Sequence, residues 1–360
     1  MGKDATVIPE QASGPGVDPS LLQRAQDGDQ VAFAELVGPY RRELHLHCYR
    51  MLGSVHDAED VLQEALLRAW RGLETFEARG SVRSWLYRIA TNRCLTARTR
   101  VASASLPGLQ AGLQPPSSNA IDVEVTALEP YPDAWLNHAA HGKSHTGMGD
   151  NGDPAARYEE RESVQLAFLT VLQLLPGRQR AVLLLRDVLA FSTTETAQIL
   201  ATSDASVNSA LYRARAALDA HRASGRLRDI ARSPESLTER GLLEEFIAAW
   251  HRRDIPALVS LLTTDALLTM PPEPLAYRGV EAISSFLSTV PAGGDLTAIR
   301  LVPTRANGQP AVAAYLREGA TALGYGIMVL TIEKDKIGEI TGFADPTLFP
   351  LFGLAFRIDW

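Results

Sequence analysis

The chain has 360 residues, of which 46% are hydrophobic and 21% charged, and its formal net charge is −7. This composition is ordinary for a folded protein, and the length favours two or three domains over a single core. Two cysteines, no secretory leader pattern and no apolar run of the roughly 20 residues that span a bilayer argue against a disulfide-stapled, secreted or membrane protein and favour a cytoplasmic one.

The negative charge is distributed unevenly along the chain. Residues 1–100 balance, residues 101–156 carry −5, residues 157–232 carry +3 and residues 233–360 carry −5. The acidic excess therefore lies outside the two stretches that contain the basic helices described below. The overall charge is not an argument against binding to nucleic acid.

Residues 20–100 predict a series of helices, after a polar start (residues 1–19) whose proline and glycine content predicts disorder. In the segment DAEDVLQEALLRAW (57–70), the apolar residues fall on one stripe, as in an amphipathic helix that packs on a core. The other face presents an acidic and amide patch that suits a basic partner helix, although charged faces that only contact solvent are commoner. This patch consists of Asp60, Gln63 and Glu64.

Residues 83–100 form a basic segment with five arginines, no acidic residue and two aromatic residues, Trp85 and Tyr87. A basic helix with interleaved aromatic residues can hold a phosphate backbone and stack on unpaired bases. Helical spacing places Trp85 close to the apolar stripe, which predicts that it lies in the core. The face opposite that stripe carries Tyr87, Arg88, Thr91 and Arg98.

Residues 101–156 lose this periodicity and have the composition of a linker. One island within them, LEPYPDAWL (128–136), is too aromatic for a passive spacer. The sequence therefore predicts a linker with one segment that makes contacts of its own.

Helical periodicity resumes at residue 157. Ser192 and Glu195 have the spacing of a capping box, which predicts that a helix starts at residue 193. A short turn at 201–203 and a second helix follow, as in a helix-turn-helix whose second helix enters the major groove of DNA. Two packed helices of an ordinary α domain would give the same pattern. Ala201 stands where such turns usually have glycine, and a left-handed backbone there would cost alanine about 1 kcal/mol.

After residue 233 the pattern changes to a mixture of helices and strands. Helices are predicted at 236–252, 255–263 and 279–289, and strands at 297–304, 310–317, 322–333 and 337–344. This order predicts an α+β domain.

Together these segments resemble an extracytoplasmic-function sigma factor of the bacterial sigma-70 superfamily. The segment 57–70 is similar to the helix that binds the polymerase clamp, the segment SVRSWLYRIATNRCL (81–95) to the helix that reads and melts the −10 element, and residues 175–218 to the module that reads the −35 element. The segments MPPEPLAYRG (270–279) and ADPTLFPLFGL (344–354) resemble a SnoaL-like, cone-shaped α+β domain. The resemblance implies a multidomain protein with two all-α modules, the second a helix-turn-helix, and a C-terminal α+β cone. Cones of this kind bury an apolar pocket, and the residues expected to line it are Trp250, Met270, Phe286, Tyr315, Met328 and Phe343.

The expected domains follow from this resemblance. They are a disordered N-terminus (1–19), sigma region 2 (20–100), a linker (101–156), sigma region 4 (157–232) and a SnoaL-like regulatory domain (233–360).

The resemblance also implies partners and site residues. The expected partners are core RNA polymerase, at its clamp and flap regions, and promoter DNA in duplex and melted form, with the linker directed toward the RNA exit path. Core polymerase would be bound by Asp60, Gln63 and Glu64. The −10 element would be contacted by Arg79, Gly80, Ser81, Tyr87, Arg88, Thr91, Asn92 and Arg98. The −35 element would be contacted by Ala205, Ser206, Asn208, Ser209, Tyr212, Arg213 and Arg215.

Neither catalysis nor a cofactor is expected. His45 and His47 differ by about 200° around a helix, so they cannot both face one metal ion. The C-terminal domain is expected to pack on the sigma modules and tune their activity. Two alternatives are a helix-turn-helix regulator with a small-molecule domain that acts without polymerase, and an enzyme with a helical partner-binding front.

Overall fold

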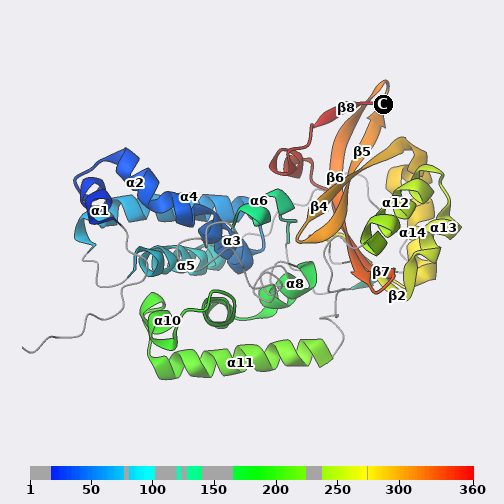
Figure 1. The fold of residues 1–360 in the computed structure, drawn as a ribbon. Coiled ribbons are helices and arrows are strands. Elements are labelled where there is room, and N and C mark those ends of the chain that lie inside the picture. Colours follow the sequence, from blue (N-terminus) through cyan, green and yellow to red (C-terminus); the bar gives the residue numbers. More distant parts are fainter. Residues whose placement is uncertain are drawn as a thin grey trace, which may run out of the picture.

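The computed structural model describes residues 18–76, 81–101, 120–122, 128–139, 165–223, 237–273 and 275–360. Figure 1 shows the N-terminal helices above, a second group of helices below them and a strand-rich lobe to one side. The architecture is therefore multidomain, with helical modules followed by an α+β lobe, as predicted. Within the described residues, no helix combines the length and the apolar character that crossing a membrane requires.

The first helical module packs α3, α4 and α5 against one another. Gly53 ends α3 with a left-handed backbone (φ 84°), which glycine adopts without strain. Ser54 then caps α4 by accepting a hydrogen bond from the N–H of Asp57 at 3.0 Å. The module consists of α1 (Pro19–Gln26), α2 (Gln30–Val37), α3 (Arg41–Leu52), α4 (Val55–Gly72) and α5 (Val82–Val101).

The second helical module contains the predicted helix-turn-helix. Its capping box is confirmed, because Ser192 Oγ accepts from the N–H of Glu195 at 3.1 Å and Glu195 Oε2 accepts from the N–H of Ser192 at 2.8 Å. Ala201 adopts the left-handed backbone that its position indicated, with φ 48°. The module consists of α8 (Leu166–Leu174), α9 (Gly177–Leu183), the π-helical segment η4 (Leu184–Val188), α10 (Thr193–Ile199) and α11 (Asp204–Ala223).

The C-terminal lobe (residues 237–360) contains three helices among its described residues, α12 (Leu237–His251), α13 (Ile255–Ser260) and α14 (Val280–Thr289). Its strands are β2 (Leu262–Thr269), β3 (Leu275–Arg278), β4 (Ile299–Ala306), β5 (Gln309–Glu318), β6 (Thr321–Glu333), β7 (Lys336–Phe343) and β8 (Arg357–Asp359). The four strands predicted from the sequence correspond to β4–β7. The helix predicted at 255–263 ends at Ser260, because the chain turns there into β2.

The sheet has the order β1-β3-β2-β7-β6-β5-β4, with β8 paired to β6. Its first strand, β1 (Ala120–Asp122), comes from the linker and pairs antiparallel with β3. A second linker element, α6 (Asp133–Ala139), lies close to α3. The linker is thus attached both to the first helical module and to the sheet of the C-terminal lobe.

The two faces of this sheet support different cores. Trp250 and Phe286 belong to the core beneath α12 and α14, and Met270 and Met328 pack against it, as predicted. The prediction is wrong for Tyr315 and Phe343, because side chains alternate along a strand and these two point to the opposite face. That face is covered by the 3₁₀ segment η7 (Pro346–Phe352) and by the helical modules.

Candidate nucleic-acid and polymerase interface

The acidic and amide patch lies on the exposed face of α4. Asp60, Gln63 and Glu64 are all exposed. The Gln63 amide donates to Glu59 Oε1 at 2.9 Å, and Glu64 pairs with Arg93 of α5. Leu67 lies one turn further along the same face and is 57% exposed. Sequence reasoning missed Leu67, although it is the one leucine of the segment that falls outside the apolar stripe.

On α5 the structure exposes only part of the predicted −10 surface. Ser81, Arg88 and Asn92 are exposed. Arg79 and Gly80 lie outside the described residues, as does the side chain of Arg98. Trp85 is buried and stacks on Phe76 at 4.9 Å between ring centroids, which confirms its predicted place in the core.

Two residues require correction, because Tyr87 and Thr91 are fully buried. Thr91 Oγ1 is hydrogen-bonded to His47 Nε2 at 2.9 Å, within the first helical module itself. The Tyr87 ring packs edge-on against Phe191 of the second module, with 5.1 Å between centroids. Helical spacing identifies one core stripe, but α5 is covered on two sides and therefore buries two stripes.

Arg83 holds this contact between the two modules. Its guanidinium lies 5.0 Å from the ring centre of Tyr87 and 4.5 Å from that of Phe191, and it pairs with Glu43 at 3.3 Å. Such cation–π contacts strengthen when they are shielded from water. Burial raises the pKa of Tyr87 well above its usual value, so the phenol is neutral near pH 7.

A second set of contacts joins the modules at the end of α3. Arg180 of α9 is fully buried and donates to the carbonyl of Met51. Gln173 of α8 donates to the carbonyl of Arg50 at 3.2 Å. These donors satisfy carbonyls of the last turn of α3, which the helix itself leaves without partners. No pattern in the sequence predicts that Arg180 is internal.

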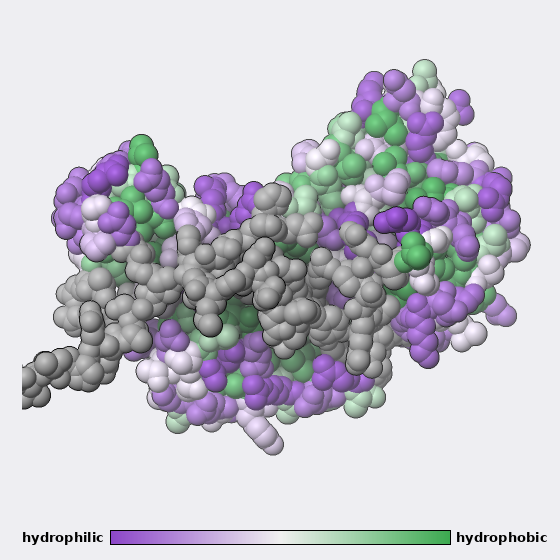
Figure 2. All heavy atoms as spheres, in the orientation of Figure 1, coloured by the Kyte–Doolittle hydropathy of each residue, from purple (hydrophilic) through white to green (hydrophobic). Residues whose placement is uncertain are grey.

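The predicted −35 surface, in contrast, is open. Tyr212 is 77% exposed, and Arg213 is exposed next to it. Arg215 is also exposed, but it pairs with Asp187, with two nitrogen–oxygen distances of 2.7 and 2.9 Å. Figure 2 shows mostly hydrophilic residues along the edge that α11 forms in Figure 1. The other predicted residues of this surface are also exposed: Ala205, Ser206, Asn208 and Ser209.

The aromatic island of the linker crosses the first module as a strap, here called the linker strap (residues 128–136). Glu129 Oε2 accepts from the N–H groups of Val55 at 2.7 Å and His56 at 3.2 Å, at the start of α4. The Tyr49 hydroxyl donates to the carbonyl of Glu129 at 2.7 Å. The strap therefore caps the helix that carries the acidic and amide patch.

The β4–β5 turn (residues 307–309) connects the C-terminal lobe to the linker strap and to both helical modules. The amide of the buried Asn307 accepts from the N–H of Tyr131 at 2.8 Å and donates to the Tyr49 hydroxyl at 2.8 Å. The next residue, Gly308, donates its N–H to Asp133 Oδ1 at 2.7 Å. Gln309 Oε1 accepts from the N–H of Leu166, the first residue of α8, at 3.3 Å. One turn thus contacts the strap and both helical modules.

The histidines of α3 are placed as structural residues. His45 Nδ1 is hydrogen-bonded to the Tyr131 hydroxyl at 3.0 Å, and burial lowers the pKa of His47 to about 3. Across the described parts of the chain, no group of three or more His, Cys, Asp or Glu side chains is arranged to hold a metal ion.

Three protein families match the chain. Sigma-70 region 2 matches residues 36–103, Sigma-70 region 4 matches residues 165–218, and the SnoaL-like domain matches residues 243–340. The first match covers α3 to α5 of the first helical module, the second covers the second helical module up to residue 218, and the third covers most of the C-terminal lobe.

Individual relatives agree with these families. The chain is 43% identical over 356 residues to the ECF RNA polymerase sigma factor SigG of Mycobacterium tuberculosis, which covers 98% of this chain and 89% of that protein. It is 32% identical over 202 residues to the ECF RNA polymerase sigma-E factor of Escherichia coli, 56% of this chain and 92% of that one. The crystal structure of the Mycobacterium tuberculosis sigma factor SigJ has the same fold, with a TM-score of 0.57 and 24% identity over 89% of this chain and 99% of that chain.

The chain contains two sigma-70 modules and is 43% identical to a sigma factor along almost its full length. These matches exclude the alternative of a helix-turn-helix regulator that acts without polymerase. The chain belongs to the extracytoplasmic-function RNA polymerase sigma factors, which direct promoter-specific initiation of transcription, and it carries a SnoaL-like domain at its C-terminal end.

Proposed function

We propose that the exposed face of α4 binds the clamp of core polymerase, with Leu67 as the apolar centre of a polar surface. An exposed leucine among Asp60, Gln63 and Glu64 has the arrangement of an interface, in which an apolar anchor lies inside a polar rim. Glu64 is 51% exposed although it pairs with Arg93, whose own side chain is only 12% exposed, so its carboxylate can accept a further basic group of the partner while it keeps this pair.

The test for this surface is binding of the full chain to purified core polymerase. Leu67→Asp places a charge at the centre of the interface and is expected to weaken binding at least ten-fold. Leu237→Asp is the matched control, because Leu237 is 86% exposed and lies on the C-terminal lobe. Equal binding by both variants would exclude Leu67 from the interface.

On the DNA side, α11 reads the −35 element and the exposed part of α5 takes part at the −10 element. Small residues at the start of α11 allow close approach to base edges, and Tyr212 and Arg213 project further along. Ser81, Arg88 and Asn92 present a hydroxyl, a guanidinium and an amide for phosphates and an extruded base. Thr91 is excluded from this surface, since its hydroxyl is bonded to His47. The contact with the polymerase flap and the path of the linker toward the RNA exit stay predictions.

The C-terminal lobe keeps the two modules in a closed arrangement, in which the second module covers Tyr87. Two buried contacts support this proposal. Tyr87 of the first module packs against Phe191 of the second, and the β4–β5 turn of the lobe is hydrogen-bonded to both modules. Ser81, Arg88 and Asn92 are exposed in this arrangement, whereas Tyr87 can meet melted DNA only after the second module has left it. The lobe therefore tunes initiation from within the same chain, in the cytoplasm where polymerase and the chromosome meet.

Transcription in vitro with core polymerase tests the role of the lobe. A chain ending near residue 233 is expected to open promoters more readily than the full chain. A chain ending near residue 345 keeps most of the lobe but lacks Leu348 and Phe349 of η7, which are fully buried in the full chain. It is therefore expected to open promoters as readily as the chain that ends near residue 233. Identical activity of all three chains would contradict a regulatory lobe.

A further inference from the structure

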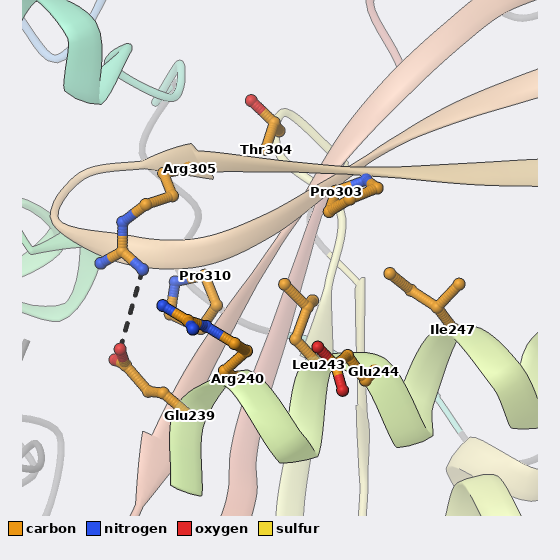
Figure 3. Close-up of a pocket in the computed structure, with 9 residues that line it drawn as sticks. All are labelled: Glu239, Arg240, Leu243, Glu244, Ile247, Pro303, Thr304, Arg305 and Pro310. Atoms are coloured by element: carbon orange, nitrogen blue, oxygen red, sulfur yellow. Dashed lines mark ion pairs between the residues drawn. The ribbon is translucent and has the colours of Figure 1, made fainter. Parts of the chain in front are cut away.

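A cavity of about 420 Å³ lies on the C-terminal lobe, between the start of α12 and the ends of β4 and β5. Cavities of this size commonly hold small molecules. Figure 3 shows Arg240 and Arg305 at one end of it and Leu243, Ile247 and Pro303 toward the other. Glu239 lies at the same end as the two arginines and pairs with Arg305, so this end is charged, with two cations and one anion, and the other end is apolar. It is separate from the apolar interior of the cone, which aromatic residues of α12 and α14 fill.

The guanidinium of Arg305 belongs both to this cavity and to the closed arrangement. It lies 3.1 Å from Asp133 of the linker strap and 3.7 Å from Glu239 of α12. It also donates to the carbonyl of Gly308 in the β4–β5 turn at 3.1 Å. A ligand that draws Arg305 toward the cavity would remove one of the bonds that hold Asp133.

Arg240 provides the attraction for such a ligand. It takes part in no ion pair within the described ranges, and its side chain points to the same end of the cavity as Arg305. Glu239 and Glu244 also line the cavity, but Glu239 is paired with Arg305 and Glu244 lies one helical turn beyond Arg240, so Arg240 is the group that can attract an anion. A single negative head with an apolar body matches this distribution of charge and surface.

We propose that this cavity binds an amphipathic organic anion, such as a medium-chain carboxylate. Its carboxylate pairs with Arg240 and Arg305, and its apolar body lies along Leu243, Ile247 and Pro303. Because Arg305 then no longer bonds Asp133, the ligand favours release of the linker strap. This regulatory step rests on the proposed function of the lobe. The ligand shifts the equilibrium between the closed and open forms only by the difference in its affinity for the two.

Calorimetric titration of the full chain with octanoate tests the site itself, with octylamine as the cationic match of equal length. Octanoate is expected to bind more tightly than octylamine, and Arg240→Gln to weaken octanoate at least ten-fold. Arg252→Gln is the control, because Arg252 is an exposed arginine at the far end of α12. Absence of octanoate binding, stronger binding of octylamine, or equal affinities of wild type and Arg240→Gln would each overturn the proposal.

A second variant tests the connection to the strap. Asp133→Asn removes the charge that competes for Arg305, so octanoate is expected to bind several-fold more tightly to it. An unchanged affinity would overturn the coupling between ligand and strap. If octanoate binds wild type as expected but Asp133→Asn initiates no more transcription than wild type, the closed arrangement fails as a regulatory state while the ligand site stands.

Discussion

The two DNA-reading helices of this sigma factor are in opposite states. On α11, every residue predicted to meet the −35 element is exposed, and the helix packs on its own module through the stripe Val207, Ala210, Leu211 and Ala214. On α5, Tyr87 is fully buried beneath Phe191 of the other module. The difference predicts an order of events, in which α11 reads the −35 element as duplex DNA before Tyr87 of α5 is uncovered for melted DNA.

Loss of the contact between Tyr87 and Phe191 is expected to have the largest effect on the difference between α5 and α11. Phe191→Ala removes a buried aromatic side chain, which typically costs about 3–5 kcal/mol, and much of that loss falls on the closed arrangement. Promoter opening in vitro by the full chain is expected to rise at least ten-fold at limiting polymerase. Phe356→Ala is the control, because Phe356 is 51% exposed and lies near the end of the C-terminal lobe.

Because Phe191 also packs within its own module, a second variant guards against misfolding. Arg83→Gln removes the cation that stacks on both rings and leaves the second module untouched. It is expected to raise promoter opening in the same direction by a smaller factor. A closed arrangement held by this contact is ruled out if both variants are folded, by circular dichroism, and neither one is more active than wild type.

The β4–β5 turn is the second point at which the closed arrangement can be broken. Asn307→Ala removes two side-chain hydrogen bonds and leaves the Tyr49 hydroxyl and the Tyr131 N–H without these partners, which is expected to cost about 2–4 kcal/mol. The backbone at Asn307 is left-handed (φ 57°), which glycine adopts without strain. Asn307→Gly therefore loses the same hydrogen bonds without adding backbone strain, and comparison with Asn307→Ala separates the loss of the bonds from the strain. Small-angle scattering is expected to show an expanded molecule for both variants. An unchanged radius of gyration would place the docking energy elsewhere.

Acid is expected to destabilise the first helical module, where the buried His47 is hydrogen-bonded to Thr91 of α5. Because burial lowers the pKa of His47 to about 3, the unfolded chain binds a proton below about pH 6.5 that the folded chain does not bind. Stability is therefore lost as the pH falls, by about 1.4 kcal/mol per pH unit until about pH 3 is reached. Urea unfolding at pH 5.5 and 4.5 measures this slope, and His47→Gln is expected to reduce it by about that amount. Parallel slopes for the two proteins would mean that His47 is protonated in the folded state.

The same comparison explains how far the sequence could predict the structure. Periodicity identified α4, α11 and four strands of the sheet, because each of them has one buried stripe or regular alternation. It failed for Tyr87, because Phe191, which covers this ring, belongs to a module more than 60 residues away in the chain. It failed for Thr91, because the bond of this hydroxyl to His47 depends on how α3 packs on α5. It also missed Leu67, since an apolar residue outside the stripe has no periodic signal.

The linker shows the other limit. Its aromatic island predicted contacts but could not name the partners, because Asn307 and Gln309 belong to a turn far along the chain and carry no motif of their own. Neither could composition predict that a short linker segment becomes the edge strand β1. Such partners are chosen by tertiary geometry, which local patterns do not contain.

The smallest expected effect lies in the turn before α11, where the comparison can be sharpened without altering any contact with DNA. Ala201→Gly relieves the left-handed backbone at φ 48° and is expected to stabilise the chain by up to about 1 kcal/mol in urea unfolding. Ala216→Gly, at an exposed position inside α11, makes the same chemical change where the backbone is helical and is expected to cost about 1 kcal/mol. Opposite signs for the two variants, with unchanged affinity for duplex −35 DNA in Ala201→Gly, would show that the turn stores strain while the reading face of α11 is already in its working form. A loss of affinity in Ala201→Gly would mean that the strained turn itself positions the helix.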